Sequence, residues 1–375
     1  MKFHWVFSTF AVGGPQRRFA NLAPYLGDNI EHIVTAMDGD YAAAALLGDT
    51  IDWRPLHLPV TKTSGTSLAN INTFRKVLIE ESADLLLTSN WGTIEWRLAN
   101  RGRVARPQVH FEDGFGPIET IRKRKISRDL TRRVLFANWR QKSKTTFIAP
   151  SKDLGDLFQS AWGAPVDRVR VIPNGVPFHH FSSIAPWPNR PFTVGFVGAL
   201  RREKRIDRLI RIFASVRRQN DARLLIVGDG PLRAVLEREA SASPAADAIQ
   251  FAGAQDDVAP YLGKMDLFCL PSDTEQMPIS LIEAMAAGLP VVASDVGDVK
   301  STVARENRKF IHAAEDEAAM TCSIRGLAAD RALRSKIGAA NRDRASARYS
   351  LEAMLDAHKA AYFETMGQKP AESRA

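Results

Sequence analysis

The sequence predicts a two-domain α/β protein in which each domain contains a doubly wound parallel sheet. Its 375 residues exceed what one hydrophobic core usually supports, so we expect two domains of roughly 180 residues each. Short apolar runs alternate with helical stretches, a pattern typical of parallel sheets with crossover helices. The clearest example spans residues 267–294, which follow the order strand, loop, helix, strand. The loop of such a right-handed crossover opens at the carboxyl edge of the sheet, where doubly wound folds bind ligands.

The composition is that of a globular protein. Hydrophobic residues make up 45% and charged residues 25% of the chain, which is ordinary for this class, and no apolar run approaches the roughly 18 residues of a membrane span. Cys269 and Cys322 provide no disulfide framework, which favours a reducing cytoplasm. The first residues lead into Gly13-Gly14 without a small-residue cleavage site, so they indicate a first strand rather than a signal peptide.

The first domain is expected over residues 1–185 and contains six apolar runs that predict strands. These runs cover residues 3–8, 32–36, 85–88, 108–111, 146–149 and 169–172. After the first run, Gly13 and Gly14 precede an amphipathic helix predicted over residues 19–26. Glycines at a strand-to-helix turn let the backbone approach a phosphate closely, although a lone pair of glycines is more often only a turn.

Polar and aromatic residues follow the strand predicted at residues 85–88. Asn90 and Trp91 come soon after it, and Trp96 lies a little further along the chain. Sugars stack their apolar faces on aromatic rings while their hydroxyls need hydrogen-bond partners. Asn90 and Trp91 are therefore candidate contacts for a sugar, although two tryptophans at this spacing could equally pack in the core.

The richest loop of the first domain follows the strand predicted at residues 108–111. His110 lies at the end of that strand, and Glu112 and Asp113 come directly afterwards. A lone histidine is more often structural than catalytic, but this one is followed by two carboxylates at a ligand-binding edge. Glu112 and Asp113 could orient the histidine, bind substrate hydroxyls or act as a base, and the sequence does not decide which of them has which role.

The second domain is expected over residues 186–348, after a proline-containing linker with its boundary near residue 185. Strands are predicted to begin near residues 192, 224 and 249, and residues 316–346 are predicted to be helical. The Gly-Asp-Gly at residues 228–230 lacks the third glycine of a dinucleotide-binding fingerprint. A last amphipathic helix is predicted within residues 349–367, and the polar tail 368–375 is expected to be disordered.

Two glutamates, Glu275 and Glu283, bracket the start of the helix in the 267–294 segment. Pro278 suits the first helical turn, where a missing N–H costs nothing. The free N–H groups of that turn, including those of Ile279 and Ser280, suit an anion such as a diphosphate, as does the positive end of the helix dipole. Glu283 lies further into the helix, where its carboxylate could accept two hydrogen bonds from a sugar diol.

Glu275 and Glu283 are separated by seven residues and are followed by AMAAGLPVV at residues 284–292. This block resembles the E-x7-E signature of the retaining glycosyltransferases of family 4, which have the GT-B fold. The spacing alone is weak evidence, since any amphipathic helix can place two glutamates in this way, but the whole block is specific. The resemblance is close over residues 192–300 and looser in the first domain. It implies two Rossmann-like domains facing across a cleft, with the nucleotide sugar held mainly by the second domain and the acceptor by the first. It also implies that the last helix crosses back onto the first domain.

The resemblance implies a phosphate-binding loop after the strand that begins near residue 192. Lys204 matches the lysine of that loop, and its ammonium would neutralise the diphosphate leaving group. Ala199 stands where the family usually has arginine, and Arg205 stands where it usually has glycine. Either Arg201 or Arg202 would then supply the missing positive charge.

The other donor contacts implied by the resemblance come from several loops. Gly14 would face the donor across the cleft, and the backbone near Ala254 would meet the nucleobase. Ile279 and Ser280 would contact the diphosphate, and Glu283 would bind the ribose.

The same resemblance places Glu275 at the transferred sugar, and His110 beside the donor sugar. We therefore interpret Glu275, His110, Lys204 and Arg201 as candidate catalytic residues. Asn90, Trp91, Glu112 and Asp113 are the candidate acceptor contacts.

The net charge of +9 is concentrated in one stretch, residues 122–144. Ten basic residues stand there against one acid, Asp129, so the stretch alone has an excess equal to that of the whole chain. The basic residues are Arg122, Lys123, Arg124, Lys125, Arg128, Arg132, Arg133, Arg140, Lys142 and Lys144. An anionic membrane surface or, less favoured, nucleic acid could bind this stretch, and a solvated basic helix is the third interpretation.

These features predict transfer of a hexose from a UDP- or GDP-sugar to a glycan or glycolipid, with retention of anomeric configuration. Cell-surface polysaccharide or lipopolysaccharide assembly is the expected setting, in the cytoplasm or at the inner face of the cytoplasmic membrane. Backbone recognition of a base leaves little side-chain trace, so UDP and GDP are not separated. No metal is expected, because a lysine and a helix dipole would neutralise the leaving group. The triplet at residues 38–40, Asp-Gly-Asp, lies far in sequence from the donor elements and is interpreted as a loop.

Three other classes remain as alternatives. A nicotinamide oxidoreductase would share the Rossmann-like halves, but G-x-G-x-x-G is absent after the first strand. A nucleic-acid-binding protein would use residues 122–144. A GT-B sugar-nucleotide epimerase is nearest in fold, and it would release free sugar without an acceptor.

Overall fold

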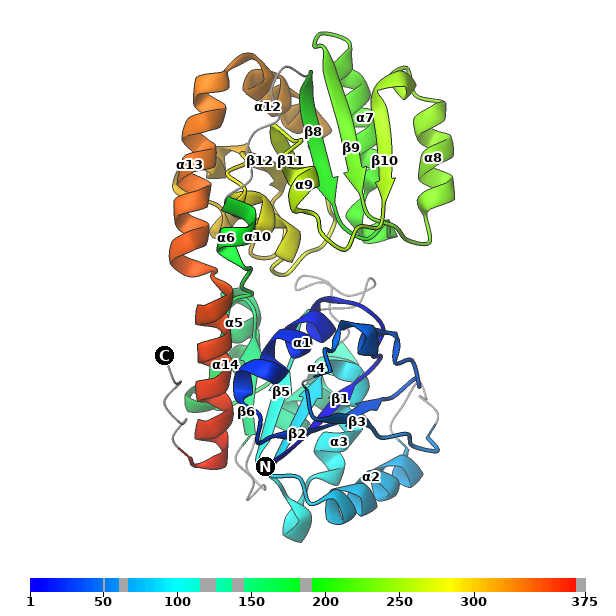
Figure 1. The fold of residues 1–375 in the computed structure, drawn as a ribbon, viewed down its shortest axis with the longest axis vertical. Helices are drawn as coiled ribbons and strands as arrows, with labels where there is room; N and C mark the ends of the chain where they lie inside the picture. The colour runs from blue at the N-terminus through cyan, green and yellow to red at the C-terminus, as the bar shows by residue number, and fades with distance from the viewer. Residues whose placement is uncertain (50, 61–66, 115–125, 137–144, 183–190, 369–375) are drawn as a thin grey trace. The chain divides into compact units, whose positions relative to one another are not determined.

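The computed structural model describes residues 1–49, 51–60, 67–114, 126–136, 145–182 and 191–368. These residues form two compact units, each built around one parallel sheet (Figure 1). Unit 1 comprises Met1–Phe115, Ile121–Ile172 and Met354–Ala375, and the main part of unit 2 is Pro173–Ala353.

The units divide between Ile172 and Pro173. The boundary predicted near residue 185 falls within residues 183–190, which lie outside the described part of the chain. The tail predicted to be disordered also lies outside it, apart from Gln368.

Unit 1 contains a seven-stranded parallel sheet in the order β3-β2-β1-β4-β5-β6-β7. Its strands are β1 (Lys2–Phe7), β2 (Glu31–Ala36), β3 (Trp53–Pro55), β4 (Leu85–Ser89), β5 (Gln108–Phe111), β6 (Thr145–Ala149) and β7 (Val169–Val171). The six predicted strands are confirmed within one residue at each end, because most are apolar runs buried on both faces of a parallel sheet. The sequence does not predict β3, which has only three residues, one of them Pro55.

The helices of unit 1 flank this sheet (Figure 1). They are α1 (Gly14–Leu26), α2 (Leu68–Glu81), α3 (Ile94–Ala99), α4 (Ile126–Phe136), α5 (Lys152–Ser160), most of α14 (Leu351–Met366) and the 3-10 helices η1 (Ala42–Leu46), η2 (Trp91–Thr93), η3 (Gly102–Val104) and η4 (Val166–Arg168). The prediction that α1 begins at residue 19 is wrong, since the helix begins at Gly14. Pro15 lies in its first turn, where proline lacks only an N–H that has no helical partner.

The last helix, α14, packs on unit 1. The Tyr362 ring makes edge contacts with the rings of Phe3 and Trp5 in β1. The hydroxyls of Thr365 and Thr146 in β6 are 2.6 Å apart. These buried contacts join the end of the described chain to the centre of the first sheet.

Unit 1 also contains buried histidines. His4 in β1 is hydrogen-bonded through Nε2 to Thr35 Oγ1 at 2.9 Å, and burial lowers its pKa to about 3. His32 in β2 accepts a hydrogen bond at Nδ1 from Trp5 Nε1 at 3.0 Å, and burial lowers its pKa to about 4. Burial also lowers the pKa of His358 in α14 well below the ordinary value. All three imidazoles are therefore neutral at physiological pH.

Unit 2 contains a six-stranded parallel sheet in the order β10-β9-β8-β11-β12-β13. Its strands are β8 (Phe192–Val197), β9 (Ala222–Val227), β10 (Ile249–Gly253), β11 (Leu267–Leu270), β12 (Val291–Ser294) and β13 (Ile311–His312). Its helices are α6 (Phe178–Ser182), α7 (Ile206–Arg217), α8 (Arg233–Ser241), α9 (Ala259–Leu262), α10 (Ile279–Ala286), α11 (Val299–Thr302), α12 (Glu317–Ala329) and α13 (Arg331–Arg348), with 3-10 helices η5 (Arg202–Lys204), η6 (Ala246–Ala248) and η7 (Arg305–Phe310).

Two predictions for unit 2 need correction. The helical stretch predicted over residues 316–346 is two helices that meet at Asp330, whose carboxylate accepts a hydrogen bond from Leu333 N and caps α13. Pro278 lies immediately before α10, at the cap position, rather than in its first turn.

Across the described ranges, no helix is both long enough and apolar enough to cross a membrane. Both cysteines are free; Cys269 is buried in β11 and Cys322 is exposed on α12.

Candidate active site

The point at which the strand order of unit 2 reverses lies between β8 and β11. In doubly wound sheets the loops at the carboxyl ends of such strands form the ligand-binding crevice. Here these loops are residues 198–205, after β8, and residues 271–278, after β11. Most of the predicted donor residues of unit 2 lie on these two loops or on the start of α10.

The loop after β8 is supported by the Gly-Asp-Gly turn after β9. Gly228 has a φ of +135°, and a side chain there would meet the carbonyl oxygen of Gly198 at 2.0 Å. A side chain at Gly230 would meet the carbonyl oxygen of Leu200 at 2.7 Å. Glycine is therefore required at both positions because the turn after β9 packs closely against the backbone of the loop after β8. This packing accounts for the two glycines without a role in dinucleotide binding.

Lys204 and Glu275 meet between these two loops. Lys204 Nζ donates to Glu275 Oε1 at 2.6 Å, and Ser272 Oγ donates to the same oxygen at 2.7 Å. The Glu275 side chain is 7% exposed and the Lys204 side chain 20%. The sequence predicts separate roles for these residues, at the sugar and at the diphosphate, but it does not predict that they pair with each other.

The backbone of the Glu275 loop is fixed from two neighbouring segments. Gly297 has a φ of +52°, and a side chain there would meet the carbonyl oxygen of Glu275 at 2.1 Å. Asp298 N donates to Gln276 O at 3.0 Å. Asn174 Nδ2 donates to the carbonyl oxygen of Met277 at 2.9 Å.

Arg205, the residue in place of the usual glycine, adopts the left-handed conformation that glycine would adopt, with φ 51° and ψ 48°. That conformation costs a non-glycine residue about 1–2 kcal/mol. The side chain forms ion pairs with Asp207 and Asp273. Although burial opposes the change, hydrogen bonds from Arg205 and Arg211 lower the pKa of Asp207 to about 2.

The other predicted donor residues of unit 2 are at least partly accessible. Ile279 and Ser280 are the first two residues of α10, so their N–H groups have no helical partner, and Glu283 follows within the same helix. Ala254 is exposed just after β10. Arg201 and Arg202 are exposed, and within the described residues their side chains make no hydrogen bond or ion pair.

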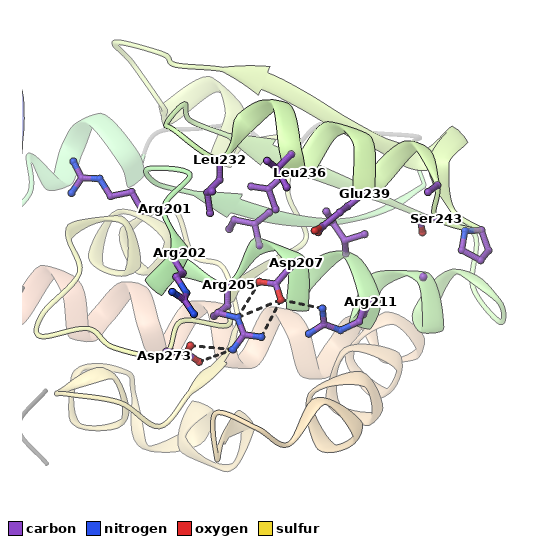
Figure 2. Close-up of a pocket in the computed structure, with 16 residues that line it drawn as sticks. Arg201, Arg202, Arg205, Asp207, Arg211, Leu232, Leu236, Glu239, Ser243 and Asp273 are labelled. Carbon is purple, nitrogen blue, oxygen red and sulfur yellow. Dashed lines mark hydrogen bonds and ion pairs between the residues drawn. The ribbon is translucent and has the colours of Figure 1, made fainter. Parts of the chain in front are cut away.

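A groove of about 830 Å³ lies between α7 and α8 (Figure 2). Arg201, Arg202 and Arg205 line one end of it, and apolar residues such as Ile210 and Leu236 line its wall. Of the predicted catalytic residues, Arg201 contributes to its lining, whereas His110, Lys204 and Glu275 do not.

In unit 1 the strand order reverses between β1 and β4, and the predicted acceptor residues lie near this edge. Asp113 N donates to Asn90 Oδ1 at 2.8 Å, which joins the loops after β4 and β5. Arg18 of α1 forms a two-pronged ion pair with Asp113. Gly14 is the first residue of the same helix and is partly exposed. Arg18 could not be identified from the sequence, because only the fold brings α1 beside the loop after β5.

His110 and Glu112 lie in a buried polar cluster rather than on the surface. His110 Nδ1 is 2.9 Å from Thr88 Oγ1, and its Nε2 is 3.4 Å from Glu112 Oε2. The other Glu112 oxygen accepts a hydrogen bond from Arg132 Nη2 at 3.0 Å. His110, Glu112 and Arg132 are at most 2% exposed. Their contacts are with protein, so a contact of His110 or Glu112 with a sugar stays a prediction.

Arg132 corrects part of the interpretation of the basic stretch. Its guanidinium lies 4.9 Å from the ring centre of Trp91 and 4.4 Å from that of Trp162, as in cation–π contacts. One of the ten basic residues of this stretch is therefore buried and packs in the core of unit 1. Residues 122–125 and 137–144, which contain most of the others, lie outside the described residues. Trp91 is partly exposed, and Trp96 packs in the core.

No group of three or more histidine, cysteine, aspartate or glutamate side chains is arranged to hold a metal ion in the described parts of the chain. In the Asp-Gly-Asp triplet, Asp38 accepts a hydrogen bond from Asp40 N and Asp40 from Ala42 N. The two carboxylates thus stabilise a turn.

Two family models match the chain in succession. Residues 12–180 match "Glycosyltransferase Family 4" and residues 180–344 match "Glycosyl transferases group 1". The fold is of the GT-B type, as the two parallel sheets and the structural neighbours agree. The chain therefore belongs to the glycosyltransferases of family 4.

Known relatives are similar to the chain in sequence over part of its length, and solved structures are similar to it in fold over nearly all of it. The GDP-mannose-dependent alpha-mannosyltransferase of Mycolicibacterium smegmatis is 34% identical over 143 residues, which are 38% of this chain and 36% of that protein. Anabaena HepE in complex with UDP has a TM-score of 0.78 at 19% identity, covering 95% of this chain and 98% of that one. WaaG, a glycosyltransferase involved in lipopolysaccharide biosynthesis, has a TM-score of 0.70 at 18% identity, covering 96% and 99%. The chain aligns with less than half the length of the curated relatives it matches first, and these structures support the fold alone.

Proposed function

We propose that this protein is a retaining hexosyltransferase that uses a UDP- or GDP-sugar and acts on a glycan or glycolipid. The observation that carries the proposal is the ion pair between Lys204, on the loop after β8, and Glu275, on the loop that leads into α10, at the switch point of a family 4 sheet. A relative is named for GDP-mannose and a structural neighbour was solved with UDP, so both nucleotides remain candidates for the donor.

The proposed chemistry uses charge that the protein itself holds. When the bond to the diphosphate breaks, negative charge develops on the leaving group. The Lys204 ammonium and the free N–H groups at Ile279 and Ser280 would stabilise it, with each well-placed donor contributing about 2–4 kcal/mol. In the structure, the Lys204 ammonium forms an ion pair with Glu275. A bound diphosphate would share Lys204 and leave Glu275 to contact the sugar, while Glu283 holds the ribose.

The acceptor would be bound by unit 1, where Asn90 and Asp113 are already hydrogen-bonded to each other. Arg18 forms an ion pair with Asp113, so an acceptor hydroxyl would meet polar groups held in place before binding. We place the reaction in the cytoplasm, in assembly of a cell-surface polysaccharide or lipopolysaccharide. WaaG, with its similar fold, is a precedent for that setting. Contact with an anionic membrane through residues 122–144 is part of this proposal.

The proposal is tested first by binding and then by product analysis. UDP- and GDP-sugars are added separately, and we expect one set to raise the melting temperature, since a ligand that binds only the folded state stabilises it. The stabilising sugar is then incubated with candidate acceptors, and the anomeric configuration of the product is determined by NMR. Inversion of configuration, or no stabilisation by any nucleotide sugar, would overturn the proposal. Release of free sugar in the absence of an acceptor would favour the epimerase alternative.

A further inference from the structure

The Arg205 side chain joins the two loops of the candidate active site. Its Nη1 donates to the two carboxylate oxygens of Asp273 at 3.2 and 3.0 Å, and its Nε and Nη2 each donate to Asp207 at 3.0 Å. Figure 2 shows the guanidinium between these two carboxylates. Arg205 directly follows Lys204, and Asp273 comes two residues before Glu275. One side chain therefore connects the segments that carry the two candidate residues.

Other contacts hold the same loops, and they differ from Arg205 in burial. Asp273 N donates to the carbonyl oxygen of Glu203 at 2.8 Å. Arg208, which is 3% exposed, donates to Pro271 O at 2.7 Å and to Asp273 Oδ1 at 2.8 Å. The buried Arg208 thus attaches the start of the Glu275 loop to α7. Arg205 binds the same aspartate, Asp273, from a more exposed position.

We propose that Arg205 is a positioning residue, which keeps the Glu275 loop against the Lys204 loop so that these two side chains stay aligned. The proposal rests on the proposed function in one respect, namely that Lys204 and Glu275 act on the donor. The backbone supports it independently, because Arg205 occupies a left-handed conformation that L residues avoid. Glycine would adopt that backbone freely but could not bridge Asp207 and Asp273. The side chain thus gives this position a function that the usual glycine lacks.

The substitution Arg205→Gly tests the proposal, since glycine accepts the backbone conformation and removes only the bridge. We expect kcat to fall about tenfold or more, because small misplacements of reacting groups are costly. The dissociation constant of the free nucleoside diphosphate should change less than about threefold, since α10 and the base-binding loop are untouched. Hydrogen exchange provides the structural readout: the amide of Asp273 should exchange faster, because its bond to Glu203 joins the two loops.

Two comparisons make the test specific. Arg218→Gly removes an exposed arginine at the end of α7 and should alter neither turnover nor exchange at residues 270–276. When Arg205→Gly and Asp273→Asn are combined, the loss in kcat should be smaller than the product of the two single losses, because both remove the Arg205–Asp273 ion pair, although Asp273→Asn also weakens the pair with Arg208. Multiplicative losses, or unchanged exchange at residues 270–276 in Arg205→Gly, would overturn the positioning role. If exchange rises as expected but the unsubstituted protein turns over no nucleotide sugar, the bridge is supported and the proposed function fails.

Discussion

At the scale of single residues, the left-handed backbone of Arg205 predicts an unusual order of stability for two substitutions. Arg205→Ala would keep a conformation that costs about 1–2 kcal/mol, whereas glycine adopts it at no steric cost. After allowing for the larger entropy of glycine in the unfolded chain, we expect Arg205→Gly to unfold with a free energy about 0.5–1 kcal/mol higher than Arg205→Ala. Urea denaturation measures the difference.

The matched control for this order is Glu239, an exposed residue inside α8. There Ala should be more stable than Gly by about 1 kcal/mol, as in ordinary helices. An Ala variant that is also the more stable one at position 205 would show that the left-handed backbone carries no penalty there.

The two glutamates of the E-x7-E block predict different defects. Glu283→Ala should weaken binding of the nucleoside diphosphate about tenfold or more, because ribose hydroxyls lose their partners at a cost of about 1–3 kcal/mol. Glu275→Gln keeps the shape of the side chain and should lower kcat, by about a hundredfold, more than it lowers nucleotide affinity, because it removes charge near the reacting sugar. Calorimetry and steady-state kinetics separate the effects.

The control for both glutamates is Glu306→Ala, at an exposed position in η7, which should behave as the unsubstituted protein. Unchanged nucleotide affinity in Glu283→Ala would remove that residue from the ribose site. Equal losses of affinity in both variants would remove the division of roles between the two glutamates.

Residue types in a motif were predictable from sequence, and their partners were not. Glu275 and Lys204 were identified from the E-x7-E block and the loop after β8, but their pairing depends on the order β8-β11 in the sheet. Arg132 lies in a run of basic residues, which indicates a surface, yet it is buried against Glu112. The burial of Arg132 is visible only from the tertiary position of α4, because a buried charge requires a partner from elsewhere in the chain.

At the scale of elements, the N-terminus of α10 and Lys204 together predict that sugar transfer requires no metal ion. The diphosphate charge would be stabilised by free N–H groups and one ammonium. We therefore expect turnover to keep about its full rate in excess EDTA. Complete loss of activity that manganese or magnesium restores would contradict this mechanism.

The basic segment at residues 122–125 predicts membrane binding. Each basic residue near an anionic bilayer contributes about 1 kcal/mol of attraction. Replacing Arg122, Lys123, Arg124 and Lys125 by serine should therefore lower sedimentation with anionic liposomes by about two orders of magnitude or more, while nucleotide binding is unchanged.

The control for the basic segment removes four exposed charges from unit 2, those of Arg305, Arg308, Arg331 and Lys336. The same decrease in net charge at these positions should affect liposome binding less. Equal effects would assign the binding to net charge alone. Indifference to salt and to the substitutions at residues 122–125 would identify the segment as a solvated helix.

Elements were predictable where hydrophobic runs were long and uniform. Most strands of unit 1 were apolar runs buried between layers of helices, and they were located within one residue. The start of α1 was missed because Gly13, Gly14 and Pro15 resemble a turn, although proline is compatible with a first helical turn. The break between α12 and α13 depends on the cap formed by Asp330, and helical periodicity continues on both sides of it.

At the scale of the whole molecule, the two units differ in their buried histidines. His4, His32 and His358 all lie in unit 1, and burial lowers the pKa of each. His312 of unit 2 is partly buried, and burial also lowers its pKa. Unit 1 should therefore be the part of the protein that is more sensitive to acid.

The direction of this effect follows from proton uptake. Below about pH 6.5 the unfolded chain protonates these imidazoles, whereas the folded chain keeps His32 neutral down to about pH 4 and His4 down to about pH 3. Their contribution is fully present above about pH 6.5, and each histidine removes up to about 1.4 kcal/mol of the free energy of unfolding per pH unit below it. The stability of unit 1 should fall steeply between about pH 6.5 and pH 4.

Tryptophan fluorescence can follow this loss, since Trp5, Trp53, Trp91, Trp96 and Trp162 all lie in unit 1. His32→Asn offers the comparison, because its Oδ1 can still accept the hydrogen bond that Trp5 Nε1 gives to Nδ1. The smaller side chain should lower stability at pH 7.5 through lost packing. The slope of stability against pH should become shallower by about 1.4 kcal/mol per unit, because one titrating group has been removed. An unchanged slope, or unit 2 exchanging its amide hydrogens before unit 1 at pH 5, would show that the buried histidines do not control acid unfolding.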